Sequence, residues 1–264
     1  MRCSHRVGLV VSALTLVAGI AAPAASAAAH SDSTPQAVST DINIEGTYYW
    51  NADGFTGTLR IARVAADGSV DAILNDSGLN EHLTGTWKPS TTTLDLQRPL
   101  PDGVTQFYEY YLGGSRYSAH PTMFGGLYTT VPPATIAHGT YLDSAMPQAA
   151  SMQRPASPGA DTDVEGTYYW NADGFTGALD IYDEVNGTFA AVLNVNGQGE
   201  FLHGTRDFAH NSIWLSRPLP DGTVQTYEYL LGGSPYSQYP KMFGGYFRTS
   251  PGGISYGSYL DSAR

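Results

Sequence analysis

Four acidic side chains occupy matching places in this sequence and could perform acid–base chemistry. Glu109 lies in a Tyr-Glu-Tyr segment that returns around Glu228, and Asp143 lies in a Tyr-Leu-Asp-Ser segment that returns around Asp261. Glycosidic hydrolysis uses two carboxylates about 5–10 Å apart across a cleft. The sequence therefore leaves open a hydrolase in which one of the glutamates acts together with one of the aspartates.

Other catalytic and metal-binding signatures are missing. No histidine occupies the same place in both copies of the repeat described below, and Leu-Gly-Gly-Ser is not the Gly-x-Ser-x-Gly turn of hydrolases. Calcium-loop spacing and phosphate-binding glycine loops are absent as well. We therefore predict no catalytic set, no metal and no cofactor, and we favour a non-catalytic protein.

The sequence contains two copies of one segment. The thirteen residues EGTYYWNADGFTG at 45–57 return unchanged at 165–177, and RPLPDG, MFGG and YLDSA follow in the same order in both copies. Two domains are predicted, at 41–145 and 161–264. The stretch between them, 146–160, is rich in Pro, Ala and Ser and is typical of a linker.

The first residues have the pattern of a secretory signal. Arg2 and Arg6 precede an apolar run at 7–20, and Ala-Ser-Ala at 25–27 supplies a cleavage pattern. We predict a signal peptide at 1–27, a disordered leader at 28–40 and a protein that is secreted from the cell.

Charge and cysteine content exclude some partners. Loss of the two arginines with the signal changes the formal net charge from −11 to −13, and the only lysines are Lys88 and Lys241. Such a surface repels phosphate backbones and anionic lipids, so we expect no nucleic-acid binding and no membrane insertion. The single cysteine, Cys3, lies inside the signal, which leaves the rest of the chain without a disulfide.

Each copy has the pattern of short antiparallel strands. Phe55, Gly57, Leu59 and Ile61 alternate with polar residues and are expected to face the core. Turn sequences such as Asp-Gly recur between the apolar segments, and no segment has a sustained helical period. We predict an all-β protein with two tandem copies of a small antiparallel barrel or sandwich.

The segment GTYYWNADGFTGTLRIARVAADGSV, at 46–70, resembles the opening hairpins of the avidin family of up-and-down barrels. The resemblance covers about a quarter of each copy and implies a meandering barrel of avidin or lipocalin type. Gly54-Phe55 replaces the serine that such barrels place after the first strand, and no matching set of tryptophans follows. No biotin site is inferred.

Several residues could form a binding site in each copy. Tyr49 and Asn51 share one face of the first strand and Asp53 follows in the turn, which places a flat ring beside groups that can bond sugar hydroxyls. Packing of both faces into the core is the alternative. The counterparts in the second copy are Tyr169, Asn171 and Asp173.

Three further features are candidates for binding. The segments 113–126 and 232–245 are predicted to be long loops, whose Tyr and Ser side chains suit adaptable recognition; the residues are Ser115, Tyr117, Ser234 and Tyr236. Glu109 and Glu228 either bind ligand or pair with Arg98 and Arg217 on a neighbouring strand. Trp214 is expected to point outward, where an exposed tryptophan is typical of an interface.

These features favour a secreted, non-catalytic, bivalent protein with one binding site per repeat. Its partner would be an extracellular glycan or a protein surface. The alternatives are an inhibitor of an extracellular enzyme that uses the loop at 113–126, the hydrolase described above, and a structural role in a wall or sheath.

Overall fold

The computed structural model describes residues 42–76, 78–101, 103–114, 122–131, 137–145, 164–232, 241–251 and 253–262. Among these residues the chain forms sixteen strands and no helix. No helix of the described part is long and apolar enough to cross a membrane. The predicted signal, leader and linker lie outside the described residues.

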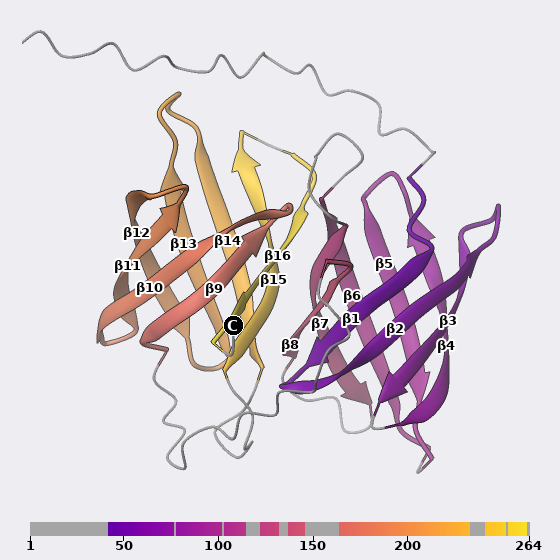
Figure 1. Ribbon diagram of the computed structural model, residues 1–264. Helices are drawn as coiled ribbons and strands as arrows, with labels where there is room; N and C mark the ends of the chain where they lie inside the picture. Colours follow the sequence, from indigo (N-terminus) through magenta and orange to yellow (C-terminus); the bar gives the residue numbers. More distant parts are fainter. Residues whose placement is uncertain are drawn as a thin grey trace, which may run out of the picture. The chain divides into compact units, whose positions relative to one another are not determined.

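The strands form two closed antiparallel barrels, each in simple sequence order (Figure 1). The first barrel consists of β1 (Gly46–Ala52), β2 (Phe55–Val64), β3 (Ser69–Asp76), β4 (Leu79–Lys88), β5 (Thr93–Pro99), β6 (Thr105–Gly113), β7 (Met123–Val131) and β8 (His138–Asp143). The second consists of β9 (Gly166–Ala172), β10 (Phe175–Val185), β11 (Thr188–Val195), β12 (Gln198–Asp207), β13 (Ser212–Pro218), β14 (Val224–Gly232), β15 (Met242–Ser250) and β16 (Tyr256–Asp261). The prediction of two tandem antiparallel β-domains is confirmed, and closure of each sheet identifies them as barrels rather than sandwiches.

The turn between β1 and β2 shows why the repeated sequence folds as a hairpin. Asp53 and Gly54 have φ values of +53° and +84°, and two successive left-handed residues make the tight turn that suits the twist of paired strands. The side-chain oxygen of Asn51 accepts the Gly54 N–H at 3.1 Å. The turn is therefore stabilised by the Asp-Gly pair and by the Asn51 side chain, which accepts a backbone hydrogen bond.

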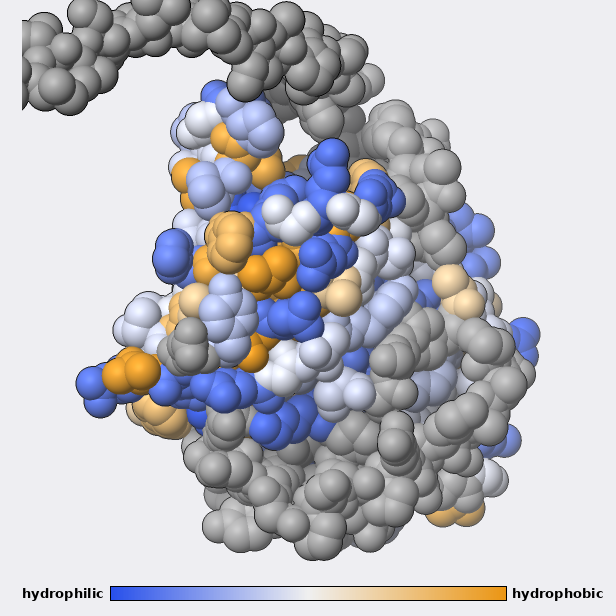
Figure 2. Space-filling model, turned by 60° about the vertical axis from the view of Figure 1, so that its left-hand side comes forward, coloured by the Kyte–Doolittle hydropathy of each residue, from blue (hydrophilic) through white to orange (hydrophobic). Residues whose placement is uncertain are grey.

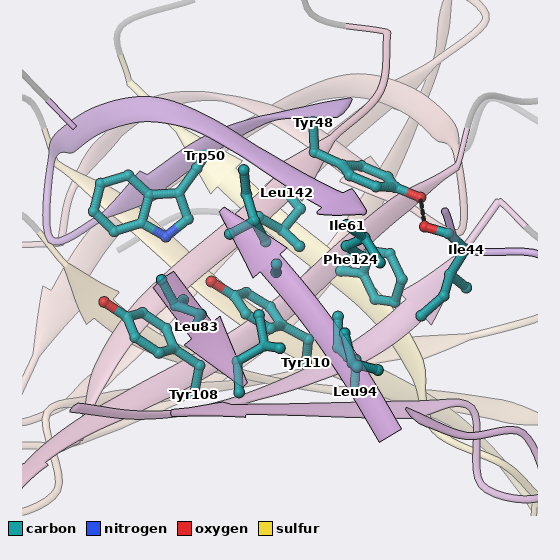
Figure 3. Close-up of a cluster of buried hydrophobic side chains, with 14 of the residues drawn as sticks. Ile44, Tyr48, Trp50, Ile61, Leu83, Leu94, Tyr108, Tyr110, Phe124 and Leu142 are labelled. Carbon is teal, nitrogen blue, oxygen red and sulfur yellow. Dashed lines mark hydrogen bonds between the residues drawn. The ribbon is translucent and has the colours of Figure 1, made fainter. Parts of the chain in front are cut away.

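Alternating residues of each strand fill the barrel interior. Tyr48 and Trp50 are 3% and 2% exposed, and the Tyr48 hydroxyl donates to the Ile44 carbonyl at 2.8 Å (Figure 3). Leu59 is equally buried, but Phe55 is 45% exposed, so the prediction that Phe55 joins the core is wrong. Phe55 begins β2 beside the turn, beyond the region where the barrel encloses side chains.

The two barrels contact each other at a seam, where matching residues of both copies form one buried cluster. Met123, Tyr141, Met242 and Tyr259 are all fully buried there, and the two tyrosine rings stack with their centroids 3.9 Å apart. The Tyr141 hydroxyl donates to Asp261 at 2.5 Å, and the Tyr259 hydroxyl donates to Asp143 at 2.5 Å. Each repeat thus supplies a donor and an acceptor to the other.

Glycines allow the close approach at the seam. A Cβ atom on Gly125 would lie 2.1 Å from the backbone oxygen of Ser258, and one on Gly244 would lie 2.1 Å from that of Thr140. These glycines belong to β7 and β15, so the prediction that the loops extend to 126 and 245 is wrong. Their function is contact between backbones rather than loop flexibility.

Candidate functional site

A charged side chain lies at one end of the first barrel, the end at which β1, β3, β5 and β7 finish. We call this end the first mouth. Arg98 points inward from β5, with its guanidinium carbon 5.8 Å from the centroid of Trp50. Its Nη2 donates to Glu81 Oε1 at 2.9 Å, its Nε donates to the other oxygen of Glu81, and its Nη1 donates to Gln106 at 3.3 Å. The Tyr108 hydroxyl also donates to Gln106, at 2.8 Å.

The second mouth repeats this arrangement with the counterpart residues. Arg217 donates to the two oxygens of Glu200 at 2.6 and 2.8 Å and to Gln225 at 3.1 Å. The Tyr227 hydroxyl donates to the same Gln225 oxygen at 2.9 Å. We refer to the Glu, Arg, Gln and Tyr of each mouth as its floor.

The floor is partly buried, and its arginine and tyrosine keep their protons at neutral pH. The side chains of Arg98 and Glu81 are 10% and 28% exposed, and those of Arg217 and Glu200 are 17% and 37% exposed. Burial lowers the pKa of Arg98, but hydrogen bonding to Glu81 and the neighbouring Tyr108 raise it overall. Burial raises the pKa of Tyr108 to about 12, so its hydroxyl stays a donor.

The same balance holds in the second mouth. Hydrogen bonding to Glu200 raises the pKa of Arg217 against the effect of burial. Burial raises the pKa of Tyr227 to about 12. Each floor therefore presents a permanent cation, a carboxylate partner and an amide side by side.

The rims of the two mouths differ. The first has Asp76, Tyr128 and His138 where the second has Val195, Phe247 and Tyr256; these three pairs of counterparts are the rim positions. Asp76 lies 3.4 Å from Arg98, a contact that valine cannot make. Both rims keep an aromatic stack, with ring centroids 5.6 Å apart in the first mouth and 5.7 Å in the second.

His138 is the unusual member of the first rim. Its Nδ1 is buried and has no hydrogen-bond partner among the described residues. The nearest carboxylate oxygen, on Asp53, is 3.7 Å away, which is too long for a direct hydrogen bond. A buried ring nitrogen without a hydrogen-bond partner calls for an explanation.

The predicted site residues of the first strand divide between seam and mouth. Tyr49 packs at the seam, 6.0 Å from Tyr141 between ring centroids, and Asn51 is 5% exposed and bonded to its own turn. Asp53 lies at the rim of the first mouth. The counterparts in the second barrel have the same places: Tyr169 packs at the seam, Asn171 is buried, and Asp173 lies at the rim of the second mouth. Asp173 also accepts the Gly114 N–H of the first barrel at 2.8 Å. No open sugar-stacking face is formed by Tyr49 and Asn51.

The predicted glutamates and tryptophan meet at one edge of the seam. Glu109 accepts the Tyr111 hydroxyl at 2.6 Å, Glu228 accepts the Tyr246 hydroxyl at 2.5 Å, and the two tyrosine rings lie 4.5 Å apart. Trp214, which is 41% exposed, is the cross-strand neighbour of Glu228.

Pairing of these glutamates with Arg98 and Arg217 is not observed. Both arginines face the barrel interior, where they bind other glutamates. The expectation of such cross-strand pairs is therefore wrong, because the glutamates and the arginines lie on opposite faces of the sheet.

The aspartates of the hydrolase hypothesis are buried at the seam. Asp143 and Asp261 are 2% and 3% exposed and accept hydroxyls from the opposite repeat. Neither faces a cleft that a substrate could enter. The loop candidates Ser115, Tyr117, Ser234 and Tyr236 lie outside the described residues.

The floor residues were missed by the sequence analysis, although a signal was present. Arg98 follows Leu94 and Leu96 at spacing two, which places it on the buried face of its strand. Arg217 follows Ile213 and Leu215 in the same way. A charged residue in phase with core residues in both copies predicts an inward-pointing ion pair.

The outer surfaces of the barrels also differ. Figure 2 shows orange hydrophobic residues set among blue hydrophilic ones on the face that it brings forward. In the second barrel Phe201 is 73% exposed and lies opposite Val192, whereas its counterpart in the first barrel is His82. The first barrel thus presents a polar residue at this position.

Comparisons with known proteins identify no relative of established function. No protein family and no curated protein matches the sequence. One solved structure is similar, the crystal structure of a protein with unknown function from the DUF3598 family of Nostoc punctiforme, with 10% identity, a TM-score of 0.29, and coverage of 82% of this chain and 92% of that one. Within the described residues, no group of three or more His, Cys, Asp or Glu could hold a metal ion.

Proposed function

We propose that this chain is a secreted, non-catalytic protein that binds an extracellular glycan at the mouth of each barrel. The observation that supports it is the floor, which has the same four residues and the same hydrogen bonds in both barrels. Apolar residues in place of a buried ion pair are often neutral or stabilising. A barrel end that served stability alone would therefore not require the charged floor.

The chemistry of the floor suits a sugar. Glutamate accepts hydrogen bonds, arginine donates them and glutamine does both, which matches hydroxyls that each donate and accept. The mouths of β-barrels are also among the preferred places for small-molecule sites. Two mouths in one chain add avidity towards a polymer whose units can reach both.

The test is calorimetric titration of the full secreted chain with a glycan selected on an array. Two sites per chain are expected for wild type, and one for Glu81→Gln or Glu200→Gln, because glutamine keeps the shape but removes the carboxylate. Glu109→Gln is the matched control at the seam and should keep both sites. An array without binders, or two sites in the double variant Glu81→Gln/Glu200→Gln, would reject the proposal.

A further inference from the structure

We infer that Tyr111 and Tyr246 form a site of oxidative cross-linking, at which a haem peroxidase and hydrogen peroxide join the two barrels through a dityrosine bond. The two rings come from β6 of the first barrel and β15 of the second, and their centroids lie 4.5 Å apart at an interplanar angle of 47°. Both residues are half-buried at the edge of the seam. The site is separate from the mouths and does not depend on the proposed glycan binding.

This pair differs from every other tyrosine pair among the described residues. Tyr141 and Tyr259 stack with their centroids 3.9 Å apart, but both are fully buried. Each remaining pair of tyrosines in ring contact also includes at least one buried ring. Within the described part of the chain, an oxidant in solution therefore reaches both members of a close pair only at Tyr111 and Tyr246.

Each of the two phenols has an acceptor for the proton that oxidation releases. The Tyr111 hydroxyl donates to Glu109 at 2.6 Å, and the Tyr246 hydroxyl donates to Glu228 at 2.5 Å. Burial, and next these hydrogen bonds, raise the pKa of both tyrosines, so both hydroxyls are protonated at neutral pH. Loss of an electron makes a phenol far more acidic, and its proton then moves to the carboxylate along the existing hydrogen bond.

One molecule of hydrogen peroxide balances the reaction. Each tyrosine gives up one electron and one proton, and the peroxide takes both electrons and both protons to become two molecules of water. The two phenoxyl radicals then form a carbon–carbon bond between ring carbons beside the oxygens, and each ring becomes aromatic again as the hydrogen of that carbon is replaced by a proton on the oxygen. Because the rings are held in contact, the radicals meet without diffusion, which favours a bond within one chain.

Such a bond would connect the barrels in a chain that has no disulfide to do so. The only cysteine is Cys3, in the predicted signal. A bond between positions 111 and 246 closes a long loop and lowers the entropy of the unfolded chain, as a disulfide does in an oxidising compartment. The counterparts of the two tyrosines are Leu230 and Leu127, so packing at these positions does not require tyrosine.

The experiment treats the full secreted chain, in dilute solution, with a haem peroxidase and hydrogen peroxide. We expect dityrosine fluorescence in the monomer fraction from gel filtration. Mass spectrometry should find the peptides of Tyr111 and Tyr246 joined, with two hydrogens fewer than the separate peptides. After cleavage at a protease site inserted in the linker, the oxidised chain should remain one band on a denaturing gel, whereas the untreated chain should separate into two.

Two variants test the assignment of the residues. Tyr111→Leu and Tyr246→Leu introduce the residue of the other copy and should each reduce the monomer fluorescence at least about tenfold, because the remaining tyrosine has no ring beside it. Tyr182→Phe is the matched control, since it removes a half-buried tyrosine of β10 away from this pair and should leave the fluorescence unchanged. Thermal unfolding before oxidation checks that each variant is folded. The inference is overturned if no dityrosine forms, if it forms only between chains, or if Tyr246→Leu fluoresces as strongly as wild type.

Discussion

The seam between the barrels and the rims of their mouths have diverged to very different extents between the two copies. At the seam, Tyr141 and Asp143 have identical counterparts in Tyr259 and Asp261, and the contacts are reciprocal. At the rims, Asp76 and His138 have counterparts of different chemistry. A residue at the seam must fit the opposite copy, whereas the contacts of Asp76 with Arg98 and of His138 with Asp53 lie within one barrel, so a change there needs no matching change in the other copy. The duplication thus produced a fixed junction with two mouths of different chemistry.

The largest effect is expected from a methyl group at the seam. Gly125→Ala would place a Cβ 2.1 Å from the Ser258 oxygen and 2.3 Å from that of Gly245, and Gly244→Ala would meet the backbone of the first barrel as closely. Backbone cannot move aside as a flexible side chain does, so each variant should lose about 3 kcal/mol or more of stability. Urea unfolding measures the loss.

The reciprocal contacts require the two glycine variants to behave alike. Gly253→Ala is the matched control, since a Cβ there meets only the Thr249 oxygen, at 3.6 Å. A loss in one glycine variant that is several times the loss in the other would contradict the symmetry of the seam.

The floors of the two mouths have the same residues, but we expect removal of the glutamate to reduce stability by different amounts because the rims differ. Glu200→Ala leaves Arg217 without its carboxylate, whereas after Glu81→Ala the carboxylate of Asp76 remains 3.4 Å from Arg98. We expect a loss of about 2 kcal/mol for Glu200→Ala, below the value for a fully buried pair since Glu200 is 37% exposed. Glu81→Ala should lose about 1 kcal/mol.

A double-mutant cycle tests the cause of that difference. In an Asp76→Val background, Glu81→Ala should become as costly as Glu200→Ala, because the first mouth then has the valine of the second. The explanation fails if the loss caused by Glu81→Ala is the same with and without Asp76.

The fold was predictable because its signals are local. The alternation of Leu59 and Ile61 with polar residues and the Asp-Gly turns determine strands and hairpins, and repetition determines the number of domains. Closure into barrels was indicated only by the resemblance to the avidin family, since the strand and turn pattern left barrel and sandwich both open. Phe55 was assigned wrongly because alternation alone does not show where a barrel ends.

The candidate sites were predictable only in part because they depend on contacts between different strands and between the two repeats. Tyr49 and Asn51 have the composition of a sugar site, but Tyr49 packs against a cluster that both repeats form and Asn51 bonds its own turn. No pattern within one copy reveals such a partner surface. Arg98 and Glu81 lie on the neighbouring strands β5 and β4, so their contact needs the register of that pair. Only the phase of Arg98 with Leu96 indicated that it points inward.

A further effect is expected from the hydroxyls of the seam. Tyr141→Phe and Tyr259→Phe each remove one donor from a buried carboxylate and should each lose about 1.5 kcal/mol of stability. Burial, and next the charge of Asp261, raise the pKa of Tyr141 well above its ordinary value. The folded state therefore holds this proton when the unfolded chain has lost it, so this contribution is present below about pH 10 and is lost as pH rises further. Tyr141→Phe should consequently weaken the fall in stability between pH 9 and pH 11, as measured by urea unfolding at each pH. An unchanged slope would contradict this expectation and would show that the seam opens before Tyr141 titrates.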